Sequence, residues 1–493
     1  MGEDFRKHAR LLAACPKSEK YSRCSDTWPT YSENLVNPDA PPSVIPLPWP
    51  NGAAIERRQH ARRREQEGLM LAFTSGIPPG GRMLYQLFEY QRAFLAPFTA
   101  WAANAAKALV DPDSSLNQVP GASCFAAGYE MLYRLGTTWE KPTFGITAVQ
   151  HDSHVIPVVE QVVLEKPFCR LLRFAPDTVA PDNAAQPTPA VLVCAPLAGH
   201  HAVMLRDVVQ ALLPDHVVYV TDWQNARGVP VAEGPFHLDD YVAQLQAFIR
   251  WIGAESLHVL AICQATVPAL AAISLLASAG EPTPTSLILV GGPIDAHRNP
   301  SAIDRLVARQ PLAWFQRNLI QTVPRPYPGA GRKVYPSFLQ LAGMCGMQPC
   351  RLIEVHRDYY LDLMRGEVEQ AETHRRICDA YLALLDMAAE FYLDTVQIVF
   401  HEFRLARGDW RIQGQSVRPQ DIRTTALLTI EGELDVISGR GQTQAAHDLC
   451  RGIPARDKRH VTARQCGHYD LFCGSRWRTE VFPDIQALTR QGT

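Results

Sequence analysis

The sequence predicts an α/β protein, with a mostly parallel central sheet and a helical cap inserted between two of its strands. From residue 190 to residue 295, short apolar runs alternate with amphipathic helical stretches. That alternation is typical of parallel strands joined by crossover helices. Between Pro293 and Arg423 the chain is mostly helical and rich in aromatic residues, and the strand pattern then returns. The helical stretch is therefore expected to cover the carboxyl edge of the sheet, where such sheets bind ligands.

The elements follow in a regular order. Two strands are expected within residues 147–174, ahead of the alternating region. The core strands are predicted at 190–196, 216–223, 257–262, 286–295 and 424–435, and the helices at 202–213, 238–253, 264–280 and 442–450. The apolar positions of each predicted helix recur at helical spacing, whereas the strands are short apolar runs. The resulting domain prediction is a helical N-terminal segment at 83–145, a core formed by 146–295 and 421–493, and a cap at 296–420.

Composition narrows the class of protein. The 493 residues carry 48 basic and 50 acidic side chains, a net charge of −2, so no overall charge favours nucleic acid or an anionic membrane. No run approaches the ~18 apolar residues that span a membrane. The 12 cysteines are scattered and no signal peptide precedes them, which favours reduced thiols in a cytoplasmic protein.

The first 82 residues differ from the rest. They hold ten prolines and the basic cluster Glu56–Glu65, and we expect them to be disordered or loosely attached. Met83, where regular structure is expected to begin, is an alternative start. The helix after it carries an apolar stripe, which is either packed on the main domain or a docking surface for an apolar partner. Pro97 is expected to kink or break this helix.

One turn of the chain carries a lone thiol between a strand and a helix. The apolar run Leu257–Ile262 leads into Cys263, and a helical stretch follows. In a nucleophile elbow, the reactive residue occupies a strained turn with small residues two positions before and after it. Ala261 and Ala265 meet that requirement, so the pattern favours Cys263 as a nucleophile. The alternative is a structural cysteine, because free cysteine is among the residues most often buried.

The order of residues after Cys263 favours catalysis. Asp435 follows a predicted strand, and His468 lies in the later loop "ARQCGHYDLF". α/β-Hydrolases place nucleophile, acid and base in this chain order. His468 is expected to accept the thiol proton and later activate water, while Asp435 fixes the tautomer of the imidazole.

Other side chains compete for these roles. Asp295 follows the strand before the cap and is the alternative acid. Glu431 and Glu433 flank the turn of Asp435 but point less naturally towards the base. His447 falls in a helical pattern and is expected to be a surface or packing residue.

The oxyanion of an ester reaction needs two backbone donors. One is expected to be the amide of Gln264, and the other lies in the loop "PLAGHHA", where Gly199 permits a close approach and His200 adds a polar contact. No metal is expected, because Cys345 and Cys350 have neither the spacing nor the histidines of a zinc site.

Several stretches carry a resemblance to a known family. They are "MLYQLFEYQRAFLAPF", "APLAGHHAVMLRDVV", "FHLDDYVAQLQAFIRWIG", "AICQATVPALAA", "GGPIDAHRNP", "AEFYLDTVQIVF" and "GQTQAAHDLC…GHYDLF". Together they resemble the intracellular poly(3-hydroxybutyrate) depolymerases of bacteria, from about Met83 to the C-terminus. The resemblance implies an α/β-hydrolase fold with Cys263 as nucleophile, Asp435 as acid and His468 as base, and no cofactor.

The implied partner is the polyester storage granule, and the implied location is the cytoplasm, at the surface of that granule. Cap aromatics are candidates to line a cleft for the polymer, with core packing as the alternative; they are Trp314, Phe391, Tyr392 and Trp410. Cys466 and Asp470 depart from the small residues of the family beside His468. The competing functions are a polyester synthase, whose elbow keeps a glycine pair that "CQATV" lacks, and an inactive granule-associated protein.

Overall fold

The computed structural model describes residues 84–490, apart from 112, 120, 138–139, 152–153, 177–188 and 348. The predictions for residues 1–82 and for Met83 lie outside this range, and so do the side chains of Cys345 and Cys350. Within the described part, no helix is both long enough and apolar enough to cross a membrane.

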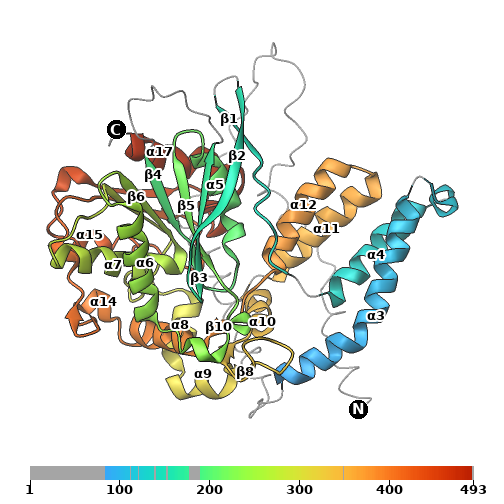
Figure 1. The fold of residues 1–493 in the computed structure, drawn as a ribbon, viewed down its shortest axis with the longest axis horizontal. Helices are drawn as coiled ribbons and strands as arrows, with labels where there is room; N and C mark the ends of the chain where they lie inside the picture. The colour runs from blue at the N-terminus through green and yellow to red at the C-terminus, as the bar shows by residue number, and fades with distance from the viewer. Residues whose placement is uncertain are drawn as a thin grey trace, which may run out of the picture. The chain divides into compact units, whose positions relative to one another are not determined.

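A nine-stranded sheet forms the centre of the molecule (Figure 1). Its strands lie in the order β1-β2-β3-β5-β4-β6-β7-β13-β14, where the run from β5 to β14 is parallel and β1, β2 and β3 pair antiparallel. In the sheet, β5 precedes β4, whereas the other strands follow one another in chain order. This order is that of an α/β-hydrolase. The bounds are β1 Ala148–His151, β2 His154–Glu165, β3 Cys169–Pro176, β4 Ala190–Cys194, β5 Val217–Trp223, β6 Leu257–Ile262, β7 Ser286–Val290, β13 Ala426–Gly432 and β14 Lys458–Ala463. Three strands, rather than the two expected, occupy the region before β4.

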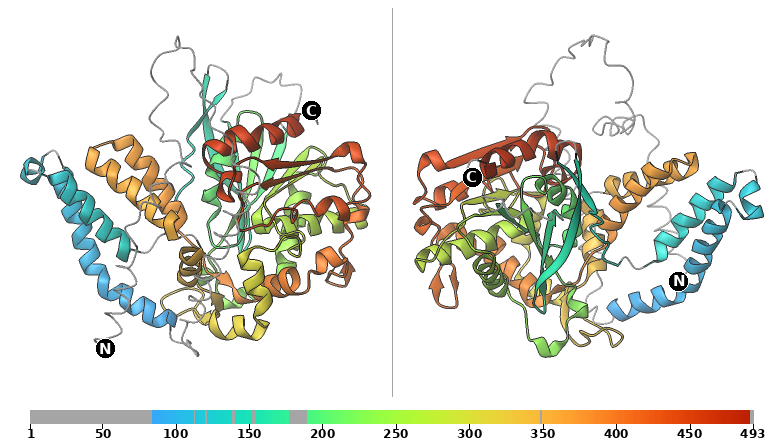
Figure 2. Two further views of the ribbon diagram at one scale, coloured as in Figure 1. Left: turned by 180° about the vertical axis from the view of Figure 1, so that it is seen from behind. Right: turned by 45° about the horizontal axis from the view of Figure 1, so that its top comes forward.

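Helices cover both faces of this sheet. α6 and α7 lie over one face in Figure 1, and α17 lies in front of the opposite face when the molecule is seen from behind in Figure 2. α6 buries Tyr241, Leu245, Phe248 and Ile249 on one side, as the sequence predicts. The bounds are α5 Arg206–Leu212, α6 Leu238–Ile252, α7 Thr266–Ser278, α15 Ala446–Leu449 and α17 Phe482–Arg490.

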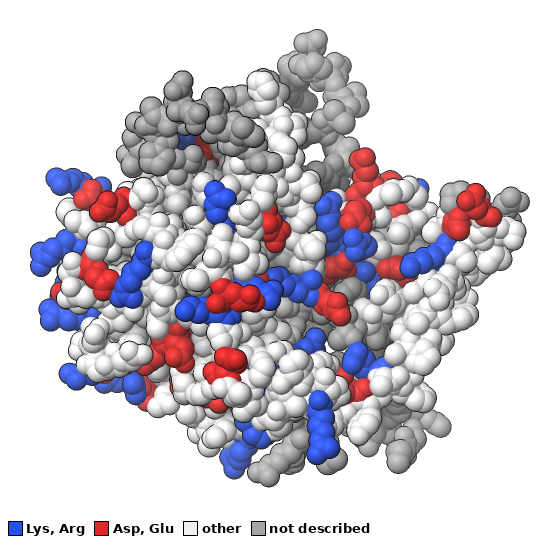
Figure 3. Space-filling view, in the orientation of Figure 1, with Lys and Arg blue, Asp and Glu red and all other residues white. Residues whose placement is uncertain are grey.

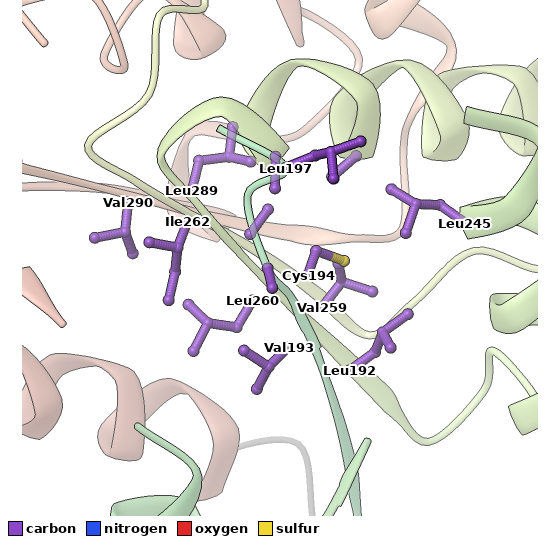
Figure 4. Close-up of a cluster of buried hydrophobic side chains, with 14 of the residues drawn as sticks. Leu192, Val193, Cys194, Leu197, Leu245, Val259, Leu260, Ile262, Leu289 and Val290 are labelled. Atoms are coloured by element: carbon purple, nitrogen blue, oxygen red, sulfur yellow. The ribbon is translucent and has the colours of Figure 1, made fainter. Parts of the chain in front are cut away.

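The core lies where the central parallel strands meet these helices. Every residue of β6 and β7 is buried, because helices cover both faces of a parallel sheet. Figure 4 shows Leu192, Val193, Val259 and Leu260 from neighbouring strands gathered there, with Leu245 of α6. Each buried side chain of this size contributes roughly 1.5–3 kcal/mol, and together they hold the carboxyl ends of the strands in fixed positions.

The insertion between β7 and β13 is mostly helical, as expected, but it also contains small antiparallel sheets. β8, β9 and β10 form one of them, and β11 pairs with β12. The helical bounds are α8 Ala302–Arg309, α9 Leu312–Asn318, α10 Ser337–Met347, α11 Pro349–Arg365, α12 Val368–Leu382, α13 Ala389–Asp394, the π-helical turn η7 Thr395–His401 and α14 Arg404–Arg407. The strand bounds are β8 Gln321–Thr322, β9 Lys333–Tyr335, β10 Met387–Ala388, β11 Arg411–Ile412 and β12 Gln415–Ser416.

Before β1 the chain forms a helical arm, residues 84–136, made of α3 Leu84–Val110, η2 Ser115–Gln118 and α4 Ala122–Gly136. α3 passes through Pro97, so the helix does not break there. Pro97 and Ala93 are both exposed, and water can therefore solvate the carbonyl that loses its hydrogen-bond donor. Of the two interpretations of the stripe of α3, packing on the main domain does not fit the structure, because most of its large side chains are exposed.

Candidate active site

Cys263 occupies a strained turn at the end of β6. Its φ is 55°, in the left-handed region that non-glycine residues rarely adopt. The short 3₁₀ turn η6, Cys263–Ala265, follows and runs directly into α7. Ala261 and Ala265 are fully buried on either side, so the small residues lie where strand and helix approach most closely. This is the geometry of a nucleophile elbow.

The end of β7 presses against this turn. A Cβ atom on Gly292 would lie 1.8 Å from Thr266 Oγ1 and 2.5 Å from the carbonyl oxygen of Cys263. Thr266 in turn donates its hydroxyl to that carbonyl at 2.8 Å. Thr443 accepts the Gly292 amide at 2.9 Å, which fixes the strand end from its other side. The elbow is therefore held by contacts that leave no space for a side chain at Gly292.

His468 and Asp435 form a buried pair. Nδ1 of His468 donates to Oδ2 of Asp435 at 2.7 Å, and the other carboxylate oxygen accepts the amides of Ile437 and Ser438 at 2.8 and 2.9 Å. The carboxylate is thus oriented by its own loop, and it orients the imidazole in turn. Nε2 is the ring nitrogen left for Cys263.

The electrostatic setting of His468 favours its charged form. Burial opposes the imidazolium, but the Asp435 carboxylate and the Cys263 thiol outweigh it and hold the pKa of His468 well above the usual 6.5. A base in this state can form an ion pair with a thiolate, which is the reactive arrangement of a cysteine nucleophile.

The departures beside His468 leave the pair intact. Burial, with the charge of Asp470, raises the pKa of the Cys466 thiol to about 12, so this second thiol stays protonated. Asp470 accepts the amide of Gly467 at 2.8 Å within the same loop. The carbonyl of Cys466 accepts the amide of Leu434 at 2.9 Å, which ties the loop of the base to the loop of the acid.

The loop after β4 is fixed at both ends. Ala195 accepts two side-chain hydrogen bonds at 2.8 Å, from Trp223 Nε1 and from the Tyr241 hydroxyl. Gly199 adopts φ 96°, and its carbonyl accepts the amide of Leu385 from the cap at 2.8 Å. The amide of Gly199 donates to Leu197 at 3.0 Å, so the contribution of Gly199 in this structure is its backbone conformation rather than an open donor.

Two of the three predicted triad residues line one pocket. Cys263 and His468 line a cavity of about 180 Å³ with an almost entirely apolar wall. His200 also lines it, and its Nε2 lies 3.2 Å from the hydroxyl of Tyr469. Gln264 is half-buried at the N-terminal end of the helical turn, where backbone amides lack helical partners. The remaining lining residues include Met204, Ile303, Met344, Tyr381, Ile437 and Phe472.

Sequence reasoning missed His201. This residue lines the same pocket, and burial, with the charge of Lys141, lowers the pKa of His201 to about 3. Its Nδ1 has no hydrogen-bond partner among the described residues. His201 thus borders the site as a neutral imidazole. His201 is adjacent to His200 in "GHHA", which could have indicated a role for it, but the sequence does not show that both histidines line the pocket.

The cap aromatics proposed from sequence do not line this pocket. Phe391 and Trp410 are fully buried, and Phe391 stacks on Tyr241 at 5.8 Å between ring centres. Tyr392 packs against Tyr335. Core packing, the alternative interpretation, is therefore what these residues do. Aromatic rings from α12 and from the loop of the base, Tyr381, Tyr469 and Phe472, line the pocket instead.

The competing acids are engaged elsewhere. Asp295 contacts Arg298 at 3.3 Å. Glu431 accepts three backbone amides, from Gly441, Thr443 and Gln444, and Glu433 accepts the amide of Gln465. His447 Nε2 lies 2.8 Å from Thr429 Oγ1, in a packing role. Among the described residues, Asp435 is the carboxylate that bonds His468.

No group of three or more His, Cys, Asp or Glu side chains in the described part of the chain is arranged to hold a metal ion. The cysteines whose side chains are described, which include Cys263, Cys466 and Cys473, form no disulfide.

Comparison with known proteins gives one family match. Residues 291–492 match the family model described as "PHB de-polymerase C-terminus", a stretch that contains Asp435 and His468 but not Cys263. The match covers less than half of the chain. No curated protein sequence matches the chain.

Several solved structures match this chain at low identity. A hypothetical protein from Pseudomonas aeruginosa is 12% identical, with a TM-score of 0.39, over 72% of this chain and 98% of that one. A putative lipase from Acinetobacter baumannii is 12% identical, with a TM-score of 0.36, over 68% and 93% of the two chains. A 2-hydroxy-6-oxo-6-phenylhexa-2,4-dienoate hydrolase from Rhodococcus is 16% identical, with a TM-score of 0.38, over 68% and 99%. The strand order, rather than these similarities, identifies the fold.

Proposed function

We propose that this protein hydrolyses the ester bonds of poly(3-hydroxybutyrate) through a Cys263–Asp435–His468 triad. One observation carries the proposal: a strained cysteine and the histidine of a buried His–Asp pair line the same apolar pocket. The family match of residues 291–492 and the fold support ester hydrolysis in general. The polyester substrate and the cysteine nucleophile are the finer part of the proposal.

The first half of the reaction forms a thioester. The Cys263 thiolate attacks the ester carbonyl carbon, and the oxyanion accepts hydrogen bonds from the Gln264 amide and from the loop that holds His200. When the carbon–oxygen bond of the ester breaks, His468 donates its proton to the departing alkoxide. Asp435 keeps the imidazole in the orientation that this transfer needs.

The second half releases the acyl group. Neutral His468 accepts a proton from water, and the resulting hydroxide attacks the thioester carbonyl. The carbon–sulfur bond breaks, the acid product leaves, and the thiolate–imidazolium pair is restored. The apolar wall suits the methyl and methylene groups of a hydroxybutyrate unit, and His201 borders the pocket as a neutral imidazole.

The proposed substrate is the amorphous storage polymer inside the cell, and the proposed location is the cytoplasm, at the granule surface. The product is 3-hydroxybutyrate or its short oligomers. The mechanism uses side chains and water, with no metal or organic cofactor.

The test follows 3-hydroxybutyrate release from amorphous polyester particles by the full chain. Cys263→Ala removes the nucleophile, so we expect release to fall by about 10³-fold or more. Cys124→Ala is the matched control, because Cys124 is an exposed cysteine on α4 and its loss should leave the rate unchanged.

Equal release by Cys263→Ala and the parent would remove Cys263 from this role. No release by a folded parent, together with CoA release and polymer growth from hydroxybutyryl-CoA, would replace the hydrolase with a polyester synthase. Inactivity in both assays would favour a non-catalytic granule protein.

A further inference from the structure

Exposed apolar side chains gather on the helical arm. Five exposed apolar side chains of α3 form what we call the aromatic stripe: Leu87, Tyr90, Phe94, Phe98 and Trp101, exposed by 61, 73, 83, 49 and 52%. Their spacing of three and four residues places them along one face of the helix. Isolated exposed apolar residues are ordinary, but a continuous row of this length marks an interaction surface.

Packing within the arm leaves this row uncovered. α3 packs against α4, and small side chains are buried on both helices, among them Ala102 and Ala106 on α3 and Ala126 and Ala127 on α4. Trp101 meets Tyr129 of α4 edge-on, at 5.2 Å between ring centres. Alanines are thus buried where α3 meets α4, and the large side chains of the stripe are exposed.

The charge of the surface indicates its partner. From Gln86 to Asn104, α3 carries only two charged residues, Glu89 and Arg92, and these pair with each other at 2.6 Å. The part of α3 visible in Figure 3 is mainly white for this reason. A helix that binds anionic lipid presents Lys and Arg beside its apolar face, and the aromatic stripe has none. An uncharged, water-insoluble surface fits it better.

The base of the arm is joined to the cap beside the active site. The Tyr85 hydroxyl donates to Asp386 at 2.6 Å, and Phe88 stacks on Phe338 at 4.5 Å between ring centres. Asp386 follows Leu385, whose amide bonds Gly199 in the loop that borders the pocket. The pocket, at about 180 Å³, holds only a short piece of a polymer, so a particle must be held by another surface.

We propose that the aromatic stripe docks the enzyme on the uncharged surface of a water-insoluble polyester particle. The inference rests on the proposed function, because that function supplies the particle. Aromatic rings pack against the methyl and methylene groups of the polymer, and the neutral exposed side chains Gln86 and Gln91 offer donors to its ester carbonyls.

The experiment measures co-sedimentation of the full chain with amorphous poly(3-hydroxybutyrate) particles, in the Cys263→Ala background so that the particles stay intact. The arm variant combines Leu87→Ser, Phe94→Ser and Trp101→Ser. The matched control combines Val155→Ser, Trp251→Ser and Val368→Ser, which are exposed apolar residues outside the arm. We expect the arm variant to lose about tenfold or more in affinity, because each substitution removes apolar area from the contact, and the control to bind like the parent.

Further measurements distinguish other partners of the stripe. Particle binding that persists in the arm variant overturns the proposal. Binding of the parent to phosphatidylglycerol vesicles as tight as to the particles makes the partner a membrane. A fall from dimer to monomer in the arm variant, with particle binding unchanged, makes the stripe a contact between two copies of the chain.

Hydrolysis of a soluble 3-hydroxybutyrate trimer, measured with Cys263 present, distinguishes this proposal from the proposed function. An arm variant that cleaves the trimer at the parental rate but loses particle binding supports docking and shows that the variant is folded. Stripe-dependent particle binding by a parent that cleaves neither trimer nor polymer would support docking and overturn the depolymerase. Release from the polymer by the arm variant at the parental rate would support the depolymerase and overturn docking through the stripe.

Discussion

The backbone of Cys263 is held at φ 55°, a conformation that costs a non-glycine residue about 1–3 kcal/mol. The hydrogen bond from Thr266 to the Cys263 carbonyl and the close approach of Gly292 hold the turn in place. The strain turns the thiol towards the cavity that His468 also lines. At the scale of single residues, the site depends on the fixed orientation of the Cys263 thiol and on the charge of the Asp435 carboxylate beside His468.

Asp435→Asn should move the alkaline limb of the pH–rate profile to lower pH. Asp435 supplies the largest favourable charge among the groups that raise the pKa of His468 against the effect of burial. The reactive imidazolium exists below that pKa and is lost as pH rises through it. Without the carboxylate the loss begins at a lower pH, and the rate should also fall by about 10²–10⁴-fold because the tautomer is no longer fixed.

The measurement is kcat/KM for a soluble ester between pH 5 and about 10. Asp295→Asn is the control, since Asp295 pairs with Arg298 and should leave the alkaline limb in place. A limb that moves with Asp295→Asn and stays with Asp435→Asn would exchange the roles of the two acids.

At the scale of elements, β7 and the β6–α7 turn are packed too closely for any side chain between them. Gly292→Ala places a methyl group within 1.8 Å of Thr266 Oγ1 and 2.5 Å of a backbone oxygen, so the strand end or the elbow must shift. We expect unfolding free energy to fall by about 1–3 kcal/mol or more, and ester hydrolysis to fall with it. Urea unfolding and the rate on a soluble ester check both effects.

Gly343→Ala is the matched control for this prediction. Gly343 lies in α10, and a Cβ there meets nothing within 4 Å. Alanine in a helix interior is favoured over glycine by up to about 1 kcal/mol, so stability should stay level or rise. A Gly292→Ala protein as stable and active as Gly343→Ala would contradict the close packing at the elbow.

At the scale of the whole described chain, the arm and the cap are joined through the buried carboxyl group of Asp386. It accepts the Tyr85 hydroxyl at 2.6 Å and the amide of Ser337 at 2.8 Å. Burial raises the pKa of Asp386, and the hydrogen bonds from Tyr85 and Ser337 counteract this effect by stabilising the carboxylate. The same residue connects α3 with the loop of Gly199 through the adjacent Leu385.

Tyr85→Phe should lower the unfolding free energy by about 1–3 kcal/mol, because it leaves a buried acceptor without its donor. Urea unfolding measures the change. Tyr90→Phe is the control: Tyr90 lies on the same helix, is 73% exposed, and its change should have no measurable effect. Equal stability of the two variants would mean that the hydrogen bond to Asp386 contributes nothing to the attachment of the arm.

The sequence by itself determined the features that depend on local pattern. The alternation of strands and helices, the position of the cap, and the strand–Cys263–helix turn all follow from short-range periodicity and small flanking residues. The chain order of Cys263, Asp435 and His468 is likewise given by the sequence alone. These features need no knowledge of distant contacts.

Only the tertiary structure decided what each side chain meets. It selected Asp435 over Asp295 as the partner of His468, turned His201 into the pocket, and buried Phe391 in the core. It also left the aromatic stripe of α3 exposed. An apolar spacing shows that a helix has an apolar face, but the burial of that face and the pKa of a histidine depend on segments far away in the chain, and those meet only when the sheet and its cap are assembled.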